Sequence, residues 1–304
     1  MKFSKRIIPL SLAALCSCAG LSWGAEAPAV PLPFGPTISA FGPAGTGFPV
    51  GKLGVLLNYQ NCETDGTRQG DREVNENVRL SKKVGVVKLR YGITEGLDIR
   101  TATPLYDVHK KNLATGKGEH LGWIGDTGIA LHKVLMNQAK GAPFDLAVDL
   151  GLVVPTTDVS NKSVDFVGNN AWGAGGAIGL TYSAGSHRLD QELHVYTFTE
   201  GAHDYRKPTY LRSTTAWGVA VNNYFDIGAE SQFDWNASSE KNGLKQNDSK
   251  NEWYAGPKVA FKYKPWGFAA GLATMFPFAR WYEANTPSEG YRVELKLSKT
   301  FDLK

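Results

Sequence analysis

From residue 51 onward, apolar and polar side chains alternate with a period of two over stretches of about ten residues. In 144–154 every even-numbered residue is apolar, whereas the odd-numbered ones include Asp145, Asp149 and Gly151. The segments 172–182, 225–235 and 291–297 repeat this pattern. Alternation of this kind is typical of β-strands with one apolar face, and no helical stripe of useful length interrupts it. The chain is therefore predicted to be all-β.

The pattern predicts twelve strands, joined by connections that alternate strictly between tight turns and longer polar loops. An even strand number with short turns at one end is typical of an outer-membrane barrel, whereas a soluble sandwich has no reason to alternate its loops. We therefore expect a 12-stranded antiparallel transmembrane β-barrel with short periplasmic turns and long extracellular loops. The predicted strands are 51–60, 78–92, 97–107, 124–137, 143–155, 171–183, 187–199, 209–222, 225–236, 252–264, 267–279 and 290–301.

The N-terminal 50 residues divide into two parts. Residues 1–24 combine three basic residues, an apolar stretch over 7–15 and small residues, which is the layout of a secretory signal peptide. Cleavage after Gly24 is preferred to cleavage after Ala27, and an alternative interpretation makes Cys18 the acylated residue of a lipoprotein box. Residues 25–50 are rich in Pro and Gly, resist helix and sheet alike, and form a predicted lead segment. The barrel would occupy 51–304.

Charge and cysteine content narrow the function classes. Removal of residues 1–24 takes three of the 33 basic residues, which leaves 30 against 29 acidic ones and argues against nucleic-acid binding by bulk charge. The same cleavage removes Cys16 and Cys18, so the mature chain has no cysteine pair for an intramolecular disulfide. Cys62 is predicted to be an unreactive loop thiol.

Aromatic residues gather near the predicted strand ends and on the apolar face, as the interfacial girdles of a barrel require. Phe301 is in phase with Leu295 and Leu297 and resembles the terminal aromatic signal read by the barrel-assembly machinery, although three residues follow it. The alternation changes phase between Val86 and Val87, which indicates a bulge or a misread strand. Pro257 and Pro277 each remove a ladder donor, so their strands are expected to loosen or bulge there.

If the apolar face meets outer-membrane lipid, the opposite face lines the lumen, and its charges must point inward because they are costly in lipid. In a functional interpretation, acids and bases on facing walls form a polar path for a small-molecule solute. In a structural interpretation, they pair across the lumen and fill it. The lead segment could also fold inside as a plug, for which Gly173, Gly175, Ala177, Gly179, Gly271 and Ala273 would leave room. The candidate path residues are Asp98, Arg100, Asp126, His132, Asp149, Arg188, Glu192, His194, Arg212, Glu230, Lys258, Lys262, Arg292 and Glu294.

Catalytic and cofactor motifs do not occur in the mature sequence: there is no GxSxG elbow, Walker loop, HExxH or CxxC pair. His132 and His194 lie in mid-strand and are predicted to face the lumen rather than to act as general bases. No two histidines have the spacing of a metal-ligand pair, so no metal, cofactor or catalytic residue is expected.

Several segments resemble the outer-membrane transporter family of the meta-pathway of phenol degradation, which is loosely similar to the long-chain fatty acid channels. The matching segments are LRYGITEGLDI at 89–99, PLY at 104–106, GD at 125–126, and the lead-segment motifs GPAG at 42–45 and PVG at 49–51. The resemblance implies a barrel that is a transporter rather than an enzyme.

Three functions remain open at this stage. The first is a passive outer-membrane channel for small, apolar or aromatic molecules, with specificity set by the loops 108–123 and 200–208. The aromatic substrate class is implied by the family resemblance alone. The second is a barrel enzyme that acts on lipid, and the third is a sealed structural or surface-binding barrel.

Overall fold

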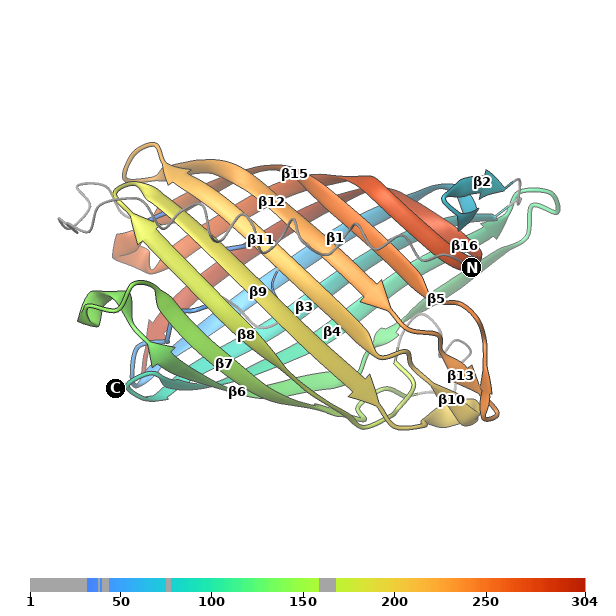
Figure 1. The fold of residues 1–304 in the computed structure, drawn as a ribbon, viewed down its shortest axis with the longest axis horizontal. Coiled ribbons are helices and arrows are strands. Elements are labelled where there is room, and N and C mark those ends of the chain that lie inside the picture. The colour runs from blue at the N-terminus through green and yellow to red at the C-terminus, as the bar shows by residue number, and fades with distance from the viewer. Residues whose placement is uncertain (1–31, 38, 40–43, 75–77, 159–167, 304) are drawn as a thin grey trace.

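A computed structural model describes residues 32–303 except 38, 40–43, 75–77 and 159–167. The predicted signal peptide, Cys18 and residues 25–31, 38 and 40–43 of the predicted lead segment lie outside the described residues. The chain forms a closed wall of tilted antiparallel strands (Figure 1). Among the described residues, the helices are short 3-10 turns, and none is long and apolar enough to cross a membrane.

Eleven labelled strands form the ring, in the order β16-β15-β12-β11-β9-β8-β7-β6-β4-β3-β1, and the pairing of β16 with β1 closes it. Strand β2 pairs antiparallel with the C-terminal end of β1, and β5 pairs with the C-terminal part of β4. The ring strands are β1 (Lys52–Gly70), β3 (Val78–Thr94), β4 (Leu97–Asn112), β6 (Thr127–Met136), β7 (Asp145–Val154), β8 (Gly173–Ala184), β9 (His187–Phe198), β11 (Tyr210–Ala220), β12 (Phe225–Asn236), β15 (Lys250–Tyr263) and β16 (Phe268–Asp302).

The remaining elements gather at the two ends of the barrel. The short connections, which include η2 (Gln138–Lys140) and η4 (Lys264–Trp266), lie at the end that also holds the C-terminus, and we call this the short-turn end (Figure 1). Gly96 and Gly185 have positive φ in two of these turns, a conformation that glycine adopts without strain. At the opposite, long-loop end lie β2 (Arg72–Val74), β5 (Gly118–Ile124), η3 (Ala202–Asp204), and a small sheet of β10 (Tyr205–Arg206), β13 (Glu240–Lys241) and β14 (Leu244–Lys245).

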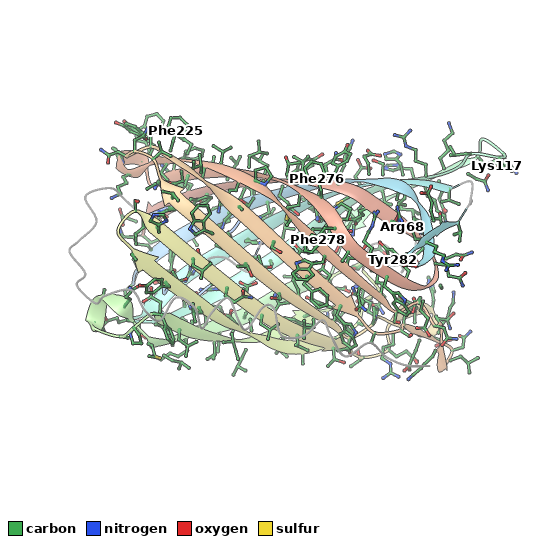
Figure 2. All side chains as sticks on the ribbon, turned by 45° about the horizontal axis from the view of Figure 1, so that its top comes forward. Arg68, Lys117, Phe225, Phe276, Phe278 and Tyr282 are labelled. Atoms are coloured by element: carbon green, nitrogen blue, oxygen red, sulfur yellow. The ribbon has the colours of Figure 1, made fainter. Side chains whose placement is uncertain are left out.

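The outer surface of the barrel is apolar, as the alternation predicts. On β7 Leu150 is 74% exposed, whereas its neighbour Asp149 is only 5% exposed. On β12 the exposed Phe225 and Ile227 alternate with the buried Asp226. Phe276 and Phe278 stand on the outside of β16, and Phe225 and Lys117 mark opposite ends of the barrel (Figure 2). An exterior of this kind is stable only in hydrocarbon, and closure leaves no strand edge unpaired there.

Three strands are longer than predicted. Strand β1 continues to Gly70 through the expected loop 61–77, and β4 and β5 form a hairpin through the expected loop 108–123. Strand β16 likewise runs through the expected loop 280–289. Beyond the apolar belt both faces of a strand meet water, so the ladder persists while the alternation that reveals it disappears.

Two predictions are wrong: the loop position of Cys62 and the bulge near Val86. Cys62 is not a loop thiol, because it lies in the extended β1 and is 1% exposed. The pairing of β3 with β1 runs without a register shift from Ser81 to Tyr91, so no bulge lies there. Val84 faces inward with Lys88 and Arg90, and this apolar residue on the polar face made the phase seem to change.

The proline predictions are borne out at Pro277. The register between β15 and β16 shifts by one residue at Trp253 and Tyr254, where Tyr254 pairs with Pro277. At Pro257 the ladder with β16 is interrupted, although the pairing with β12 stays in register. Both outcomes follow from the missing N–H donor of proline.

Candidate functional site

The polar face of the strands forms the interior, and it holds the candidate residues predicted from the sequence except Asp126, which lies in a connection. Twelve of the fourteen candidates are buried, and Arg188 and Arg212 are partly buried with side-chain exposures of 12% and 34%. Buried charges need partners because desolvation otherwise outweighs any gain. The partners of each charged residue therefore show which charges neutralise one another and which bind other parts of the chain.

A first network lies on β3, β4, β6 and β7 near the short-turn end. Asp98 accepts hydrogen bonds from Arg90 and Arg100, and its Oδ1 lies 2.7 Å from Nε of Arg100. Arg100 also approaches Asp149 at 3.7 Å, and Nδ1 of His132 lies 2.8 Å from Oδ1 of Asp149. Two arginines thus balance two carboxylates, and His132 is bound within this network at 0% exposure.

A second network lies on β12 and β15. Lys258 pairs with Glu230 at 2.9 Å, and Lys262 pairs with Asp226 at 2.6 Å. These pairs join neighbouring strands, since Ile227 pairs with Val259 in the same ladder. Four of the lumen charges therefore neutralise one another along the wall.

The same charged groups also bind the backbone of the lead segment. The N–H of Phe34 donates to Asp226 at 2.6 Å, and the carbonyl of Leu32 accepts from Lys262 at 2.7 Å. On the opposite wall, the N–H of Phe48 donates to Asp98 at 3.1 Å, and Arg90 donates to the carbonyl of Thr46 at 2.5 Å. A Pro/Gly-rich segment cannot satisfy its own backbone, and lumen side chains supply the partners instead.

Between these two points the segment reaches further into the barrel. Lys296 donates to the carbonyl of Pro36 at 2.7 Å and lies 4.8 Å from the ring centroid of Phe34. Asn58 donates to the carbonyl of Thr37 at 2.8 Å, and Lys88 donates to that of Ser39 at 2.5 Å. The described residues of the lead segment thus lie within the short-turn half of the lumen.

The small residues of the wall make room for two different neighbours. A Cβ on Gly179 would lie 2.2 Å from the carbonyl oxygen of Ala44, and one on Gly271 would lie 3.1 Å from the ring of Phe34. These two glycines face the lead segment, as predicted. Gly173 and Gly175 instead face the rings of Phe198 and Tyr196, which belong to the barrel wall. The prediction for those two positions is therefore wrong, because cross-strand aromatic side chains occupy the space.

Toward the long-loop end the lining is aromatic and charged. Asp234 pairs with Arg212 at 2.5 Å and with Arg292 at 3.2 Å. The guanidinium of Arg292 lies 3.7 Å from the ring centroid of Tyr254. Glu252 accepts hydrogen bonds from the hydroxyls of Tyr254 and Tyr282, and Tyr282 points inward from β16 (Figure 2).

A neighbouring aromatic group comes from β9 and β11. The ring of Tyr210 stacks on Tyr196 at 5.9 Å and on Phe198 at 6.1 Å, with interplanar angles of 15° and 23°. His194 lies edge-on to Tyr210 at 5.6 Å and has its Nδ1 3.2 Å from Glu192. Tyr196 is only 2% exposed, so the partly buried rings of Tyr210 and Phe198 are the accessible part of this group.

Three further candidates lie outside these groups. Arg188 forms a bidentate pair with Asp190, at 2.6 and 2.7 Å. Asp126 precedes β6 rather than lying in a strand, and it accepts from Lys207 and from the N–H of Thr157. Asp126 therefore connects the segments that contain Thr157 and Lys207 at the long-loop end. Glu294 is buried on the inner face of β16, beside Arg292 and Lys296 in the alternation.

Some lumen residues were not among the candidates. Lys88 and Arg90 were missed because Val84 and Val86 hid the phase of β3, and Tyr254 and Tyr282 were missed because aromatic residues were expected on the lipid face. The regular pairing of β3 with β4, which has alternating residues of its own, would have restored the phase.

The expectation of no metal-ligand histidine pair also needs correction. His109 and His120 are eleven residues apart in sequence but are direct cross-strand partners on β4 and β5. With Asp107 they form a group whose ligand atoms all lie within 4.8 Å of one another. Linear spacing hides such a pair, because only the hairpin register brings the two rings together.

A closed antiparallel barrel with an apolar exterior and a charged, water-side interior defines an integral outer-membrane protein. Residues 63–296 match the family model described as "Putative MetA-pathway of phenol degradation", and the chain belongs to this family. The chain is located in the outer membrane.

Two solved structures are similar in fold. An outer-membrane channel from Pseudomonas putida F1 matches with a TM-score of 0.72 and 16% identity, over 84% of this chain and 98% of the other. The translocator domain of the autotransporter NalP from Neisseria meningitidis matches with a TM-score of 0.50 and 9% identity, over 84% and 90% of the two chains. A search of curated proteins gave no significant match.

Proposed function

We propose that this protein is a passive channel that admits small apolar or aromatic molecules across the outer membrane, and that it is not an enzyme. The observation that carries the proposal is the lumen itself, a closed polar interior whose short-turn half is occupied by a segment held through side chain to backbone hydrogen bonds. Family membership supports the same proposal, and the structurally similar protein from P. putida is described as an outer-membrane channel.

The orientation follows from the physics of barrel insertion. We place the short-turn end in the periplasm and the long-loop end outside the cell, as is usual for bacterial barrels. Residues Phe268–Tyr282 of β16 pair with β15, and Tyr282–Asp302 pair with β1. On this basis β16 would make two crossings and the barrel would have twelve. Phe301, outward and 43% exposed on the last crossing, would be the signal for the barrel-assembly machinery.

Two features of the long-loop half support an aromatic or apolar solute. The partly buried rings of Tyr210 and Phe198, which pack on the buried Tyr196, would offer flat surfaces, and the guanidinium of Arg292 over the ring of Tyr254 adds a cation to this aromatic lining. The loop 200–208 would set access, since Lys207 lies 5.6 Å from the ring centroid of Phe198. The hairpin 108–123 would contribute the other side of the entrance.

The lead segment would act as a plug. Deletion of residues 25–50 is expected to raise single-channel conductance in planar bilayers, because it removes backbone that fills the short-turn half. The predicted signal peptide, residues 1–24, stays intact in this variant, so we expect it to be exported. Unchanged conductance would contradict the plug, and zero conductance in both proteins would favour a sealed barrel.

Solute preference is tested separately in cells that lack the protein. Uptake of aromatic acids and alkanes should fall in these cells and return when the chain is restored, whereas sugar uptake should not change. Equal effects on sugars and aromatic acids would contradict the proposed substrate class. Phospholipid hydrolysis by the refolded protein in micelles would instead identify an enzyme.

A further inference from the structure

The exterior of the barrel changes character along the hairpin of β4 and β5. Leu105 and Ile124 are paired, outward-facing and exposed, and they are the last apolar residues on this face of the two strands. Beyond them, on the same face, come Asp107 and the cross-strand pair His109 and His120. The group therefore stands in water beyond the apolar belt.

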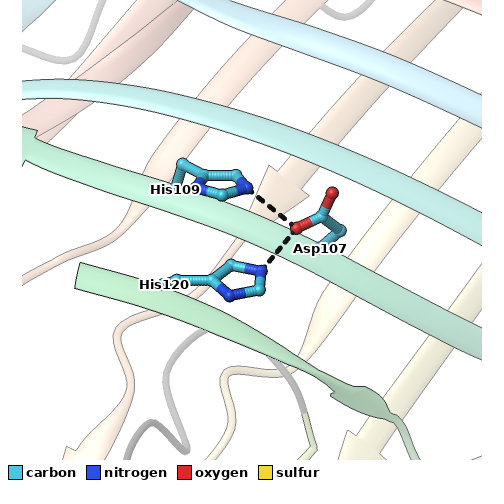
Figure 3. Close-up of side chains that lie close together, drawn as sticks. All are labelled: Asp107, His109 and His120. Atoms are coloured by element: carbon cyan, nitrogen blue, oxygen red, sulfur yellow. Dashed lines mark hydrogen bonds and ion pairs between the residues drawn. The ribbon is translucent and has the colours of Figure 1, made fainter. Parts of the chain in front are cut away.

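Both histidines approach one carboxylate oxygen. The Nε2 atoms of His109 and His120 lie 3.1 and 2.8 Å from Oδ1 of Asp107, one ring on each strand (Figure 3). The rings are stacked, with centroids 4.3 Å apart and an interplanar angle of 13°. Side chains at i and i+2 of one strand and at the opposite position of its neighbour share a face, so the sheet itself positions all three groups.

These distances fit ligands around one metal ion. Ligand bonds to zinc are about 2.0–2.2 Å for both imidazole nitrogen and carboxylate oxygen, so ligand atoms in a tetrahedral site lie roughly 3.3–3.5 Å apart. Small rotations of three exposed side chains, between 43% and 61% exposed, would bring the three atoms to that spacing. Water would complete the coordination.

A basic residue also lies close to the carboxylate. Lys83 is the cross-strand partner of Asp107 on β3, and its charge opposes a bound cation. The site therefore needs ligands that bind by more than charge, and imidazole nitrogen provides them.

We propose that Asp107, His109 and His120 form a surface site for a divalent transition-metal ion of the zinc and copper type. Two imidazoles and one carboxylate select such ions over Mg²⁺ and Ca²⁺, which prefer all-oxygen ligands. The bound ion would join β4 to β5 and stiffen the hairpin that stands at the long-loop end. This site is separate from the lumen and does not depend on the proposed transport function.

The test uses tag-free, full-length mature protein in detergent, titrated with ZnCl₂ by isothermal calorimetry at neutral pH. We expect one Zn²⁺ per barrel. His109→Ala and His120→Ala should each weaken binding by at least about tenfold, since even outer-shell changes cost about 10- to 100-fold. His187→Ala, at the short-turn end, is the matched control and should leave the affinity unchanged.

Two further measurements keep the result interpretable. His120→Gln retains a side chain that hydrogen-bonds Asp107 but lacks the imidazole, so it should lose zinc binding while the heat-modified gel shift shows a folded barrel. Trypsin cleavage at Lys111 and Lys117 should slow when Zn²⁺ is added to the wild type, but not in His120→Gln. Equal zinc affinity in all variants, or equally tight binding of MgCl₂, would overturn the proposal.

Discussion

At the scale of single residues, the interior of the barrel is governed by the cost of buried charge. Arg100 is fully buried and contacts both Asp98 and Asp149. Its side chain is the only one described in this network that joins these two carboxylates, one on β4 and one on β7. We therefore expect the network to depend on it more than on any exposed basic residue nearby.

Substitution Arg100→Met tests this expectation. It should destabilise the barrel by about 3–5 kcal/mol, because two buried carboxylates lose a shared counter-charge. The free energy of unfolding is measured by urea titration in lipid vesicles with tryptophan fluorescence. Lys133→Met, on the outward face of β6, is the control and should change stability by roughly 0.5 kcal/mol or less. Equal losses in both variants would show that the network contributes little.

At the scale of elements, the lead segment and the strand β8 are matched in shape. Gly179 allows the carbonyl of Ala44 to lie against the wall, and Thr181, two residues on, accepts the N–H of Gly45 at 3.1 Å. Gly179, which has no side chain, and Thr181, which supplies a hydroxyl, together fix the position of the lead segment along β8. A single methyl group should therefore disturb it.

Gly179→Ala introduces a Cβ 2.2 Å from that carbonyl oxygen, too close for the segment to stay in place. We expect single-channel conductance to rise, in the same direction as deletion of residues 25–50. Gly85→Ala is the control, since the nearest atom to its Cβ would be an ordinary 3.8 Å away. If both variants conduct like the wild type, the contact at Ala44 does not limit passage.

At the scale of the whole molecule, the lipid belt is the part of the barrel where the outer face is apolar. Leu150, in the middle of β7, is 74% exposed and lies in the belt, whereas Leu113 is exposed on the hairpin beyond it. The same substitution at these two positions should have different costs, because only one of them faces hydrocarbon.

Leu150→Arg should destabilise the barrel in vesicles by about 2–4 kcal/mol, and Leu113→Arg by about 0–1 kcal/mol. Urea unfolding in vesicles measures both. In detergent micelles, which let an arginine reach water, the difference between them should shrink. Similar losses of stability at the two sites in vesicles would contradict the assignment of Leu150 to the lipid belt and Leu113 to water.

The sequence determined much of the architecture on its own. Period-two alternation is a local property, so the strands within the apolar belt, their apolar outer face and most of the inward polar residues could be predicted without knowing which strands meet. Connection lengths are also local, and they identified the two ends of the barrel. The family segments at 89–99 and 104–106 pointed to the family to which the chain belongs.

Only the tertiary structure decided which distant groups meet. Three contacts depend on the strand register around a closed ring: the pairing of Arg100 with Asp149, the contact of the Ala44 carbonyl with Gly179, and the pairing of β16 with β1. Strand extension beyond the belt escaped prediction because polar residues on both faces carry no alternation. His109 and His120 became a pair only in the hairpin, since hydrogen bonding between strands, rather than distance along the chain, sets side chains opposite one another.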